Sequence, residues 1–289
     1  MDMNINWYPG HMKKTRESIQ KSLVMIDIVF ELLDSRIPYS SRNPIIDELV
    51  GRKPRIIILN KADLSSAEGN RQWQSYFEEK DIPSVLLNSL NGKGIEQLVE
   101  LARAIMAEKR KNNAAKGIIN QPIRAMILGI PNVGKSTLIN SLAKRKSAKT
   151  GNRPGITKTN QWIKTKGGIE LLDTPGILWP KFEDPMVGLN LAYTGAIKDE
   201  ILDTETLALK LLEKLTKSYP GLVEDRFQVP VDNGEPIQVM DSIAMRRGCI
   251  IKGGYIDYEK TSRLILDEFR KGLLGRITLE QPRDVIQSV

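Results

Sequence analysis

The chain has 289 residues, 40% of them hydrophobic, and a formal net charge of +8. This length suffices for one α/β core and a second module, because domains commonly hold ~100–200 residues. The single cysteine, Cys249, cannot form an intrachain disulfide, and with the single histidine, His11, it cannot supply the four ligands of a structural zinc site. An intrachain disulfide and a structural zinc site are therefore excluded as elements that stabilise the fold. We expect Cys249 to be a small buried hydrophobic residue.

No segment of the sequence has the character of a membrane span or a secretion signal. The longest apolar runs, such as Ile56–Leu59 and Val85–Leu87, are far shorter than the ~20 residues of a membrane helix. The first residues, MDMNINWYPGH, contain no apolar signal core. We therefore expect a cytoplasmic protein without a membrane partner.

Positive charge is concentrated in one stretch of the chain. Residues 101–166 contain 15 Lys or Arg residues and a single acid, Glu108. A basic surface of this size suits a polyanion, and nucleic acid is the commonest polyanion in the cytosol. A solvated basic face without a partner is the alternative.

Short apolar strands alternate with helices along the first part of the chain, after a predicted helix at about Met12–Met25. Apolar runs that end in polar residues are typical of buried parallel strands, and they occur at Asp27–Asp34, Pro54–Leu59, Pro83–Asn88, Ile123–Gly129 and Gly168–Asp173. Helices are predicted between them at Pro44–Val50, Arg71–Lys80, Ile95–Lys111 and Lys135–Ala143, and an edge strand at Thr157–Lys166. The pattern predicts a doubly wound, mostly parallel sheet with its ligands at the carboxyl ends of the strands.

Two boundaries interrupt this pattern. The polar, basic run Lys109–Gln121 is expected to be an exposed connector within the first domain. After about Trp179 the strands stop, and Thr204–Tyr219 and Lys260–Gly272 have apolar residues at helical spacing. We therefore expect an α/β domain over residues 1–180 and a small all-helical domain over residues 181–289.

The strongest chemical motif is the run GIPNVGKS at Gly129–Ser136. It matches G-x-x-x-x-G-K-[ST] between a predicted strand and a predicted helix, the context of a phosphate-binding loop. Backbone N–H groups of such a loop face phosphate oxygens, and Lys135 is expected to reach the outer phosphates and act in catalysis. Ser136 is placed to bind Mg²⁺. The predicted phosphate-side residues are Asn132, Val133, Gly134, Lys135, Ser136 and Thr137.

A base-reading motif, NKAD at Asn60–Asp63, directly follows the strand PRIIIL. The Asp63 carboxylate can accept hydrogen bonds from N1–H and the exocyclic amine of guanine, whereas adenine has no matching donor pair. We expect Asn60 to hold the neighbouring loops and the purine, and Lys61 to lie along the purine face. The end of the next strand fits a third base-side loop, with a plain strand-to-helix turn as the alternative. The predicted base-side residues are Asn60, Lys61, Ala62, Asp63, Asn88 and Ser89.

Two further segments are expected to sense the γ-phosphate. Asp173 begins the run DTPG after a predicted strand, so it is expected to hold Mg²⁺ through water while the Gly176 amide contacts the γ-phosphate in catalysis. Thr157 ends the run RPGIT between the phosphate loop and that strand. It is expected to be the metal-contacting, catalytic threonine of a mobile loop that is released after hydrolysis.

The motifs GIPNVGKST, PGIT, DTPG, NKAD and NSLNGKG together resemble those of the translation-factor-related GTPases. NKAD and NSL come first here, which is similar to the circularly permuted branch of that class. Within the branch, WYPGHM at Trp7–Met12, DSRIP at Asp34–Pro38 and the segment from Arg246 to Arg276 resemble the bacterial ribosome biogenesis GTPase A family over nearly the whole chain. The resemblance implies a circularly permuted P-loop GTPase domain followed by a small helical domain that contacts RNA.

The resemblance also implies a function. Members of this family hydrolyse GTP with Mg²⁺ and act in late assembly of the large ribosomal subunit, so the expected partners are GTP, GDP and the precursor of that subunit, with no DNA. We expect ribosome-stimulated hydrolysis that releases the protein, and RNA phosphates neutralised by Lys144, Arg145, Lys146, Arg246 and Arg247. The alternatives are a nucleotide-gated RNA-binding scaffold with incidental hydrolysis, or a GTPase that serves tRNA or a membrane process.

Two roles stay open between a functional and a structural interpretation. Ile177 occupies the position after the DxxG glycine, where Ras-like enzymes have a water-positioning glutamine. Because an isoleucine side chain cannot form hydrogen bonds, we expect His11 to position the attacking water instead. An exposed histidine at the start of a helix is the alternative. Asn132 resembles the asparagine of GTPases that use K⁺ beside the phosphates, whereas a turn-favouring asparagine is the alternative.

Overall fold

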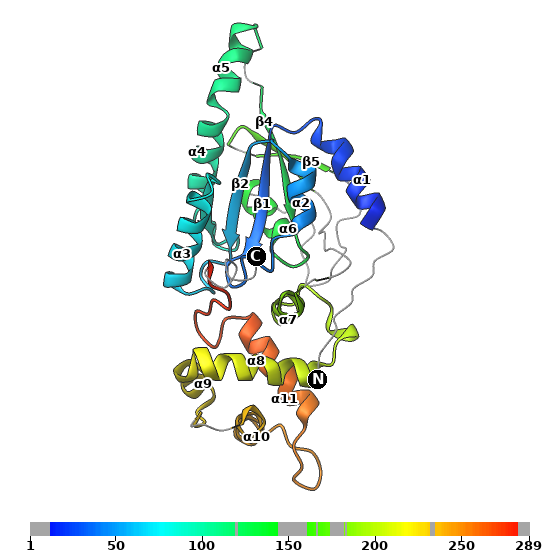
Figure 1. The fold of residues 1–289 in the computed structure, drawn as a ribbon, viewed down its shortest axis with the longest axis vertical. Coiled ribbons are helices and arrows are strands. Elements are labelled where there is room, and N and C mark those ends of the chain that lie inside the picture. The colour runs from blue at the N-terminus through cyan, green and yellow to red at the C-terminus, as the bar shows by residue number, and fades with distance from the viewer. Residues whose placement is uncertain are drawn as a thin grey trace. The chain divides into compact units, whose positions relative to one another are not determined.

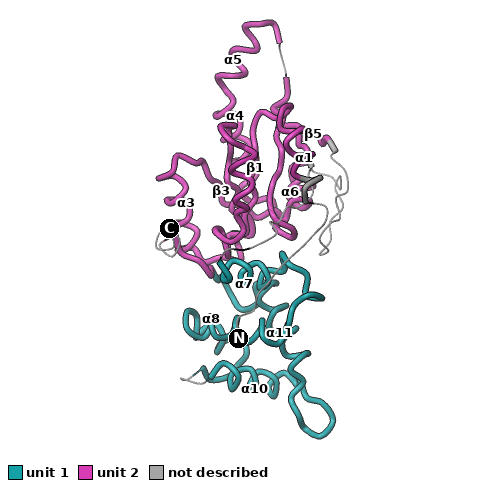
Figure 2. Tube along the Cα trace, turned by 45° about the vertical axis from the view of Figure 1, so that its right-hand side comes forward, with its two compact units in different colours: residues 1–5, 184–277 teal, residues 6–183, 278–289 magenta. Residues whose placement is uncertain are grey.

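A computed structural model of the chain describes residues 12–118, 121–143, 161–165, 167–173, 182, 184–231 and 235–282. These residues fall into two compact units (Figure 2). The described residues within Asp184–Ile277 form one, the helical unit, and those within Asn6–Glu183 and Thr278–Val289 form the other, the sheet unit. The sequence places the boundary at residue 180 and all later residues in the helical domain. The structure instead returns the chain to the sheet unit at Thr278.

The sheet unit is built on a sheet that has six strands in the described part of the chain (Figure 1). Its order is β3-β2-β1-β4-β6-β5, and every neighbouring pair is parallel except β5 with β6. The strands are β1 (Ile28–Asp34), β2 (Arg55–Asn60), β3 (Ser84–Leu87), β4 (Ile123–Gly129), β5 (Gln161–Lys164) and β6 (Ile169–Asp173). The predicted α/β fold with a mostly parallel sheet is confirmed.

Both faces of the sheet are covered at its centre, since every residue of β1 is buried, and the central strands are accordingly continuous apolar runs. On one face, Ile19 and Ile46 from two helices pack against Val29 and Met126 of the sheet. Another cluster on the same face packs Trp73 against Ile57, whose register partner Glu31 lies two residues after Val29 on β1. Each large apolar side chain buried in this way stabilises the fold by about 1.5–3 kcal/mol.

The helices of the sheet unit are α1 (Met12–Leu23), α2 (Pro44–Val50), α3 (Ala67–Glu78), α4 (Ile95–Ile105), α5 (Ala107–Ala115) and α6 (Lys135–Ala143). Ser66 caps α3, since its hydroxyl accepts the backbone N–H of Gly69. The predicted continuous helix Ile95–Lys111 and the connector that follows it were wrong in part. The helix breaks at Met106, whose backbone is not helical, and α5 then continues to Ala115. Its Ala, Glu, Lys and Arg residues favour helix without needing burial.

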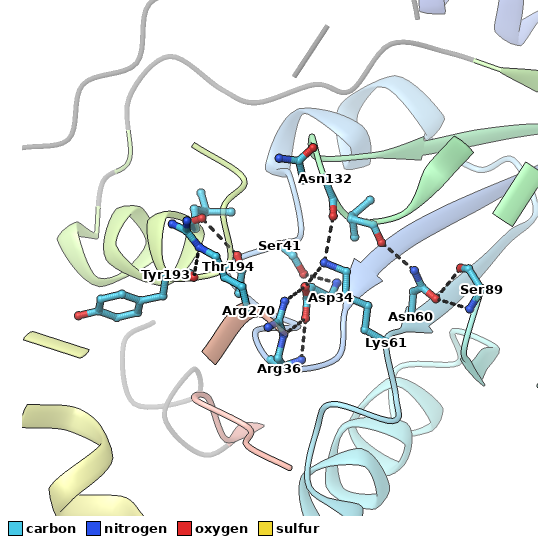
Figure 3. A network of polar contacts seen from close by, with 12 residues as sticks. Asp34, Arg36, Ser41, Asn60, Lys61, Ser89, Asn132, Tyr193, Thr194 and Arg270 are labelled. Atoms are coloured by element: carbon cyan, nitrogen blue, oxygen red, sulfur yellow. Dashed lines mark hydrogen bonds and ion pairs between the residues drawn. The ribbon is translucent and has the colours of Figure 1, made fainter. Parts of the chain in front are cut away.

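The helical unit packs its helices around α8 (Thr204–Ser218), whose buried leucines include Leu207, Leu211 and Leu215. The other elements are α7 (Pro185–Tyr193), a 3-10 turn (Asp199–Ile201), α9 (Pro220–Phe227), α10 (Pro236–Arg247) and α11 (Tyr258–Arg270). The Arg270 guanidinium donates to the carbonyl oxygen of Tyr193 at 3.0 Å, which ties α11 to the end of α7 (Figure 3). It also pairs with Asp199 at 2.7 Å.

Both helices predicted in this region are confirmed as α8 and α11, and Cys249 is buried as expected. Within the described residues, none of the helices is both long and apolar enough to span a membrane.

Candidate functional site

The carboxyl ends of the central strands bring the predicted motifs to one edge of the sheet. In the register of the sheet, Asp34 at the end of β1 lies beside Asn60 at the end of β2, and Asn60 lies beside Leu87 of β3. On the other side of β1, Leu32 lies beside Gly129 at the end of β4. The base-reading run, the third loop and the phosphate loop therefore begin next to one another.

The phosphate loop runs from β4 into α6, as its sequence predicts. Gly134 has a φ of 107°, and a Cβ there would lie 2.4 Å from Nδ2 of Asn60, so only glycine fits this approach of the two motifs. The Lys135 ammonium is buried and donates to the carbonyl oxygens of Gly129 at 3.1 Å and Ile130 at 2.7 Å. Lys135 thus folds back over its own loop, and its contact with phosphates stays a prediction.

Asn60 joins the three loops through its side chain, which is 2% exposed. Its Nδ2 donates to the carbonyl oxygen of Val133 in the phosphate loop at 2.7 Å. Its Oδ1 accepts the backbone N–H of Ser89 at 3.1 Å and the Ser89 hydroxyl at 2.6 Å (Figure 3). Because a buried amide has few alternative partners, these bonds set the spacing of the loops.

Lys61 bridges the base-reading run to two other segments. Its φ of 58° is in the left-handed region, and its ammonium donates to Oδ2 of Asp34 and to the carbonyl oxygen of Asn132, both at 2.9 Å (Figure 3). Asp34 is buried and also forms an ion pair with Arg36 at 2.8 Å. The Lys61 side chain extends between these two anchors, and its contact with a purine face stays a prediction.

The charges of this cluster depend on one another. Burial alone would raise the pKa of the Asp34 carboxyl, but the Arg36 guanidinium and the Lys61 ammonium outweigh it and hold this pKa well below its usual range. Burial lowers the pKa of Lys61, and the Asp34 carboxylate opposes that effect only in part. Asp34 is therefore a permanent anion that fixes both cations.

The third loop is shaped by Asn88, whose Oδ1 accepts the backbone N–H groups of Leu90 at 2.8 Å and Asn91 at 3.3 Å. This side chain organises the turn, and its contact with a nucleotide stays a prediction. In the base-reading run, the Ala62 backbone N–H donates to the carbonyl oxygen of Leu87 at 3.1 Å, and Asp63 is exposed.

Of the predicted metal-binding residues, those that the structure describes lie at the same edge of the sheet. Ser136 and Thr137 are half-buried in the first turn of α6, directly after Lys135. Asp173 ends β6. Asn132 has a φ of 57°, in keeping with the turn-favouring alternative for this residue.

Several predicted residues lie outside the described part of the chain. They are His11, Thr157, Gly176, Ile177, Lys144, Arg145 and Lys146. The two predicted RNA-contacting residues of the helical unit differ from each other. Arg246 is exposed, whereas Arg247 is half-buried, pairs with Glu268 at 3.4 Å and lies over the Phe227 ring. Arg247 therefore supports the fold of its own unit.

Two residues of the sheet unit, Asp34 and Glu280, have structural roles that the sequence alone does not indicate. Asp34 is a charged residue at the carboxyl end of an apolar strand, which is a recognisable signal for the ligand edge of a sheet. The Glu280 carboxylate accepts the backbone N–H of Tyr39 at 2.8 Å, a contact between residues 241 positions apart. No local pattern indicates such a contact.

Comparison with known proteins agrees with this geometry. A family model described as 50S ribosome-binding GTPase matches residues 124–216. The chain is 48% identical to ribosome biogenesis GTPase A of Bacillus cereus over 99% of this chain and 97% of that protein. The chain belongs to the ribosome biogenesis GTPase A family. The predicted family and GTPase activity are thereby confirmed.

More distant proteins also match nearly the whole chain. Mitochondrial ribosome-associated GTPase 1 of Mus musculus is 33% identical over 97% of this chain and 90% of its own length. Among solved structures, GNP-bound YlqF from T. maritima has a TM-score of 0.63 at 24% identity, covering 93% of this chain and 98% of that one. This last similarity shows a common fold.

Proposed function

We propose that the protein is a GTP-hydrolysing assembly factor in late maturation of the large ribosomal subunit. It binds pre-ribosomal RNA in its GTP form, and hydrolysis, stimulated by the ribosomal particle, releases it. The observation that carries the nucleotide part is the side chain of Asn60, which joins the phosphate loop to the third loop through Val133 and Ser89. The names of the relatives support the ribosomal part.

In this proposal each end of the site recognises one part of GTP. Asp63 reads the guanine edge, and Lys61 covers the purine face between its bonds to Asp34 and Asn132. Lys135 exchanges its carbonyl partners for phosphate oxygens, and Gly134 with the other backbone amides of its loop completes the cradle.

The residues present fit a Mg²⁺ ion, which prefers hard oxygen ligands. The Ser136 hydroxyl would bind it directly, with Thr157 as a further ligand and Asp173 holding it through a water molecule. The ion supplies positive charge to the phosphates. A K⁺ ion beside Asn132 would add charge at the same place, and hydrolysis rates that are equal in K⁺ and Na⁺ buffers would contradict that role.

The RNA partner is proposed from charge. The basic residues of positions 101–166 and the exposed Arg246 of the helical unit suit RNA phosphates, whose binding weakens steeply with salt. In this proposal the protein works in the cytoplasm.

Sedimentation of the protein in a cell lysate tests this function. The GTP-loaded protein should migrate with large-subunit precursors, and the GDP-loaded protein should stay near the top of the gradient. Migration with tRNA or membranes would contradict the proposed partner. A particle-bound protein whose hydrolysis is the same with and without the particle would instead support a nucleotide-gated scaffold, the second candidate.

A further inference from the structure

The chain returns to the sheet unit after α11 and forms a short segment, Thr278–Gln281, that we call the C-terminal strap. Thr278, Leu279 and Glu280 are buried, at 3%, 7% and 7% exposure. The Leu279 backbone N–H donates to the carbonyl oxygen of Arg36 at 2.8 Å. The strap is therefore part of the packed interior of the sheet unit rather than a loose end.

Glu280 anchors the strap to the loop that follows β1. Its carboxylate accepts the backbone N–H groups of Tyr39 at 2.8 Å and Ser40 at 3.1 Å, as well as the Ser40 hydroxyl. Its carbonyl oxygen accepts the Trp73 indole N–H of α3 at 3.0 Å. Hydrogen bonds to an ionised carboxylate are about twice as strong as neutral ones, so this anchor fixes the loop firmly.

Thr278 anchors the strap at a second place, the start of α3. Its Oγ1 accepts the backbone N–H of Ser66 at 3.1 Å and lies 3.0 Å from the Ser66 hydroxyl. Ser66 caps α3 and lies three residues after Asp63 in the chain. The strap thus contacts the segment that immediately follows the base-reading run.

Both segments that the strap contacts are connected to the base-reading run. Next to Ser40, the Ser41 hydroxyl accepts the backbone N–H of Asp34 at 3.0 Å, and Asp34 binds Lys61 of the base-reading run. On the other side, Ser66 continues the chain from Asp63. The base-reading run therefore lies between two segments that the strap fixes.

We propose that the C-terminal strap holds the base-reading run in its guanine-binding form, with Glu280 and Thr278 as positioning residues for nucleotide affinity. This inference rests on the proposed GTP site. Coupling between two sites is reciprocal, so a bound nucleotide must hold the strap more tightly by the same factor by which the strap increases affinity. The strap follows α11 of the helical unit along the chain. The chain connection that leaves the helical unit therefore ends in a segment that nucleotide binding holds more tightly.

Gly69 in the first turn of α3 offers a variant that displaces the strap and leaves the nucleotide motifs unchanged. A Cβ at Gly69 would lie 2.5 Å from Oγ1 and 2.8 Å from Cβ of Thr278. Alanine is otherwise favoured over glycine in a helix, so Gly69→Ala disturbs this contact without weakening the helix itself. Gly221→Ala in α9 is the matched control, because a Cβ there meets nothing within 4 Å.

The experiment measures GDP affinity and steady-state GTP hydrolysis of the full chain. Gly69→Ala should raise the Kd for GDP by about fivefold or more, while kcat at saturating GTP stays near the wild-type value and Gly221→Ala matches the wild type. Glu280→Ala should weaken binding more than Glu280→Gln, which keeps a carbonyl acceptor. This second pair carries the test if Gly69→Ala does not fold.

Amide hydrogen exchange distinguishes positioning from simple structural support. GDP should slow exchange at the Leu279 amide, which donates to Arg36, and at the Tyr39 and Ser40 amides, which donate to Glu280. Equal exchange with and without GDP, or equal GDP affinity of Gly69→Ala and wild type, would overturn the role of the strap and leave the proposed GTP site in place. A wild-type protein that binds no guanine nucleotide would overturn the proposed function as well.

Discussion

The side-chain amide of Asn60 donates a hydrogen bond of 2.7 Å to the backbone carbonyl of Val133, which joins the end of β2 to the phosphate loop. Because the same amide oxygen accepts from Ser89, one side chain sets the distance between the two ends of the proposed GTP site. The permuted order of the motifs leaves this junction in place, because it depends on the neighbouring strands and not on their order in the chain.

Asn60→Ala should raise the Kd for GTP by at least about tenfold and lower the free energy of unfolding by about 1–3 kcal/mol, because Ser89 and Val133 lose a buried partner. Asn113→Ala is the matched control, since its side chain binds Gln121 at an exposed site on α5. Calorimetric titration and urea unfolding measure the two effects. An unchanged Kd would show that the junction is not needed for binding.

The variant Asp63→Asn should prefer xanthine nucleotides over guanine nucleotides. The new amide can donate to the exocyclic oxygen of xanthine, whereas guanine presents an amine at that position. Competition between GDP and xanthosine diphosphate for the variant measures the exchange. Equal GTP affinity of variant and wild type would remove Asp63 from the base-reading role.

Asp34→Asn should lower the free energy of unfolding at pH 7 by about 3–5 kcal/mol, because it leaves Arg36 buried without its counter-charge. The folded-state pKa of Asp34 is depressed, so its contribution is fully present above the unfolded pKa of about 3.9 and is lost as the pH falls through the folded value. The difference between wild type and variant should therefore be constant from pH 7 to pH 5 and shrink below about pH 4. Urea unfolding across this range measures it, and a difference that grows on acidification would contradict the assignment.

His11→Ala should lower ribosome-stimulated kcat by roughly 10²-fold and leave the Kd for GTP near its wild-type value, if the imidazole positions the attacking water. Single-turnover hydrolysis with saturating ribosomal particles measures this. Unchanged stimulated turnover in the variant would assign the water to a group of the particle and make His11 a surface residue.

Five of the six described strands were predictable because each is an apolar run, and these five end within one residue of the expected position. The phosphate loop was predictable because its glycines and Lys135 form a local pattern. The break at Met106 was missed because the residues on both sides favour helix, so only the backbone geometry reveals it.

The tertiary part of the site could not be predicted in the same way. Lys61 was expected along a purine, and nothing local to the NKAD run indicates that Asp34 binds its ammonium. Glu280 is far from Ser40 in the chain, and a lone glutamate near a terminus has the same pattern as a solvated residue. Such contacts depend on how the strands and the C-terminal strap meet in space.

The most direct test of the account is single-turnover GTP hydrolysis by the wild-type protein with and without purified large ribosomal subunits. The proposed assembly factor should hydrolyse GTP slowly alone and at least about tenfold faster with large subunits, since a completed site stabilises the transition state. Small subunits should leave the rate unchanged. A rate that large subunits do not alter would contradict the proposal that the ribosomal particle is the partner that triggers this GTPase.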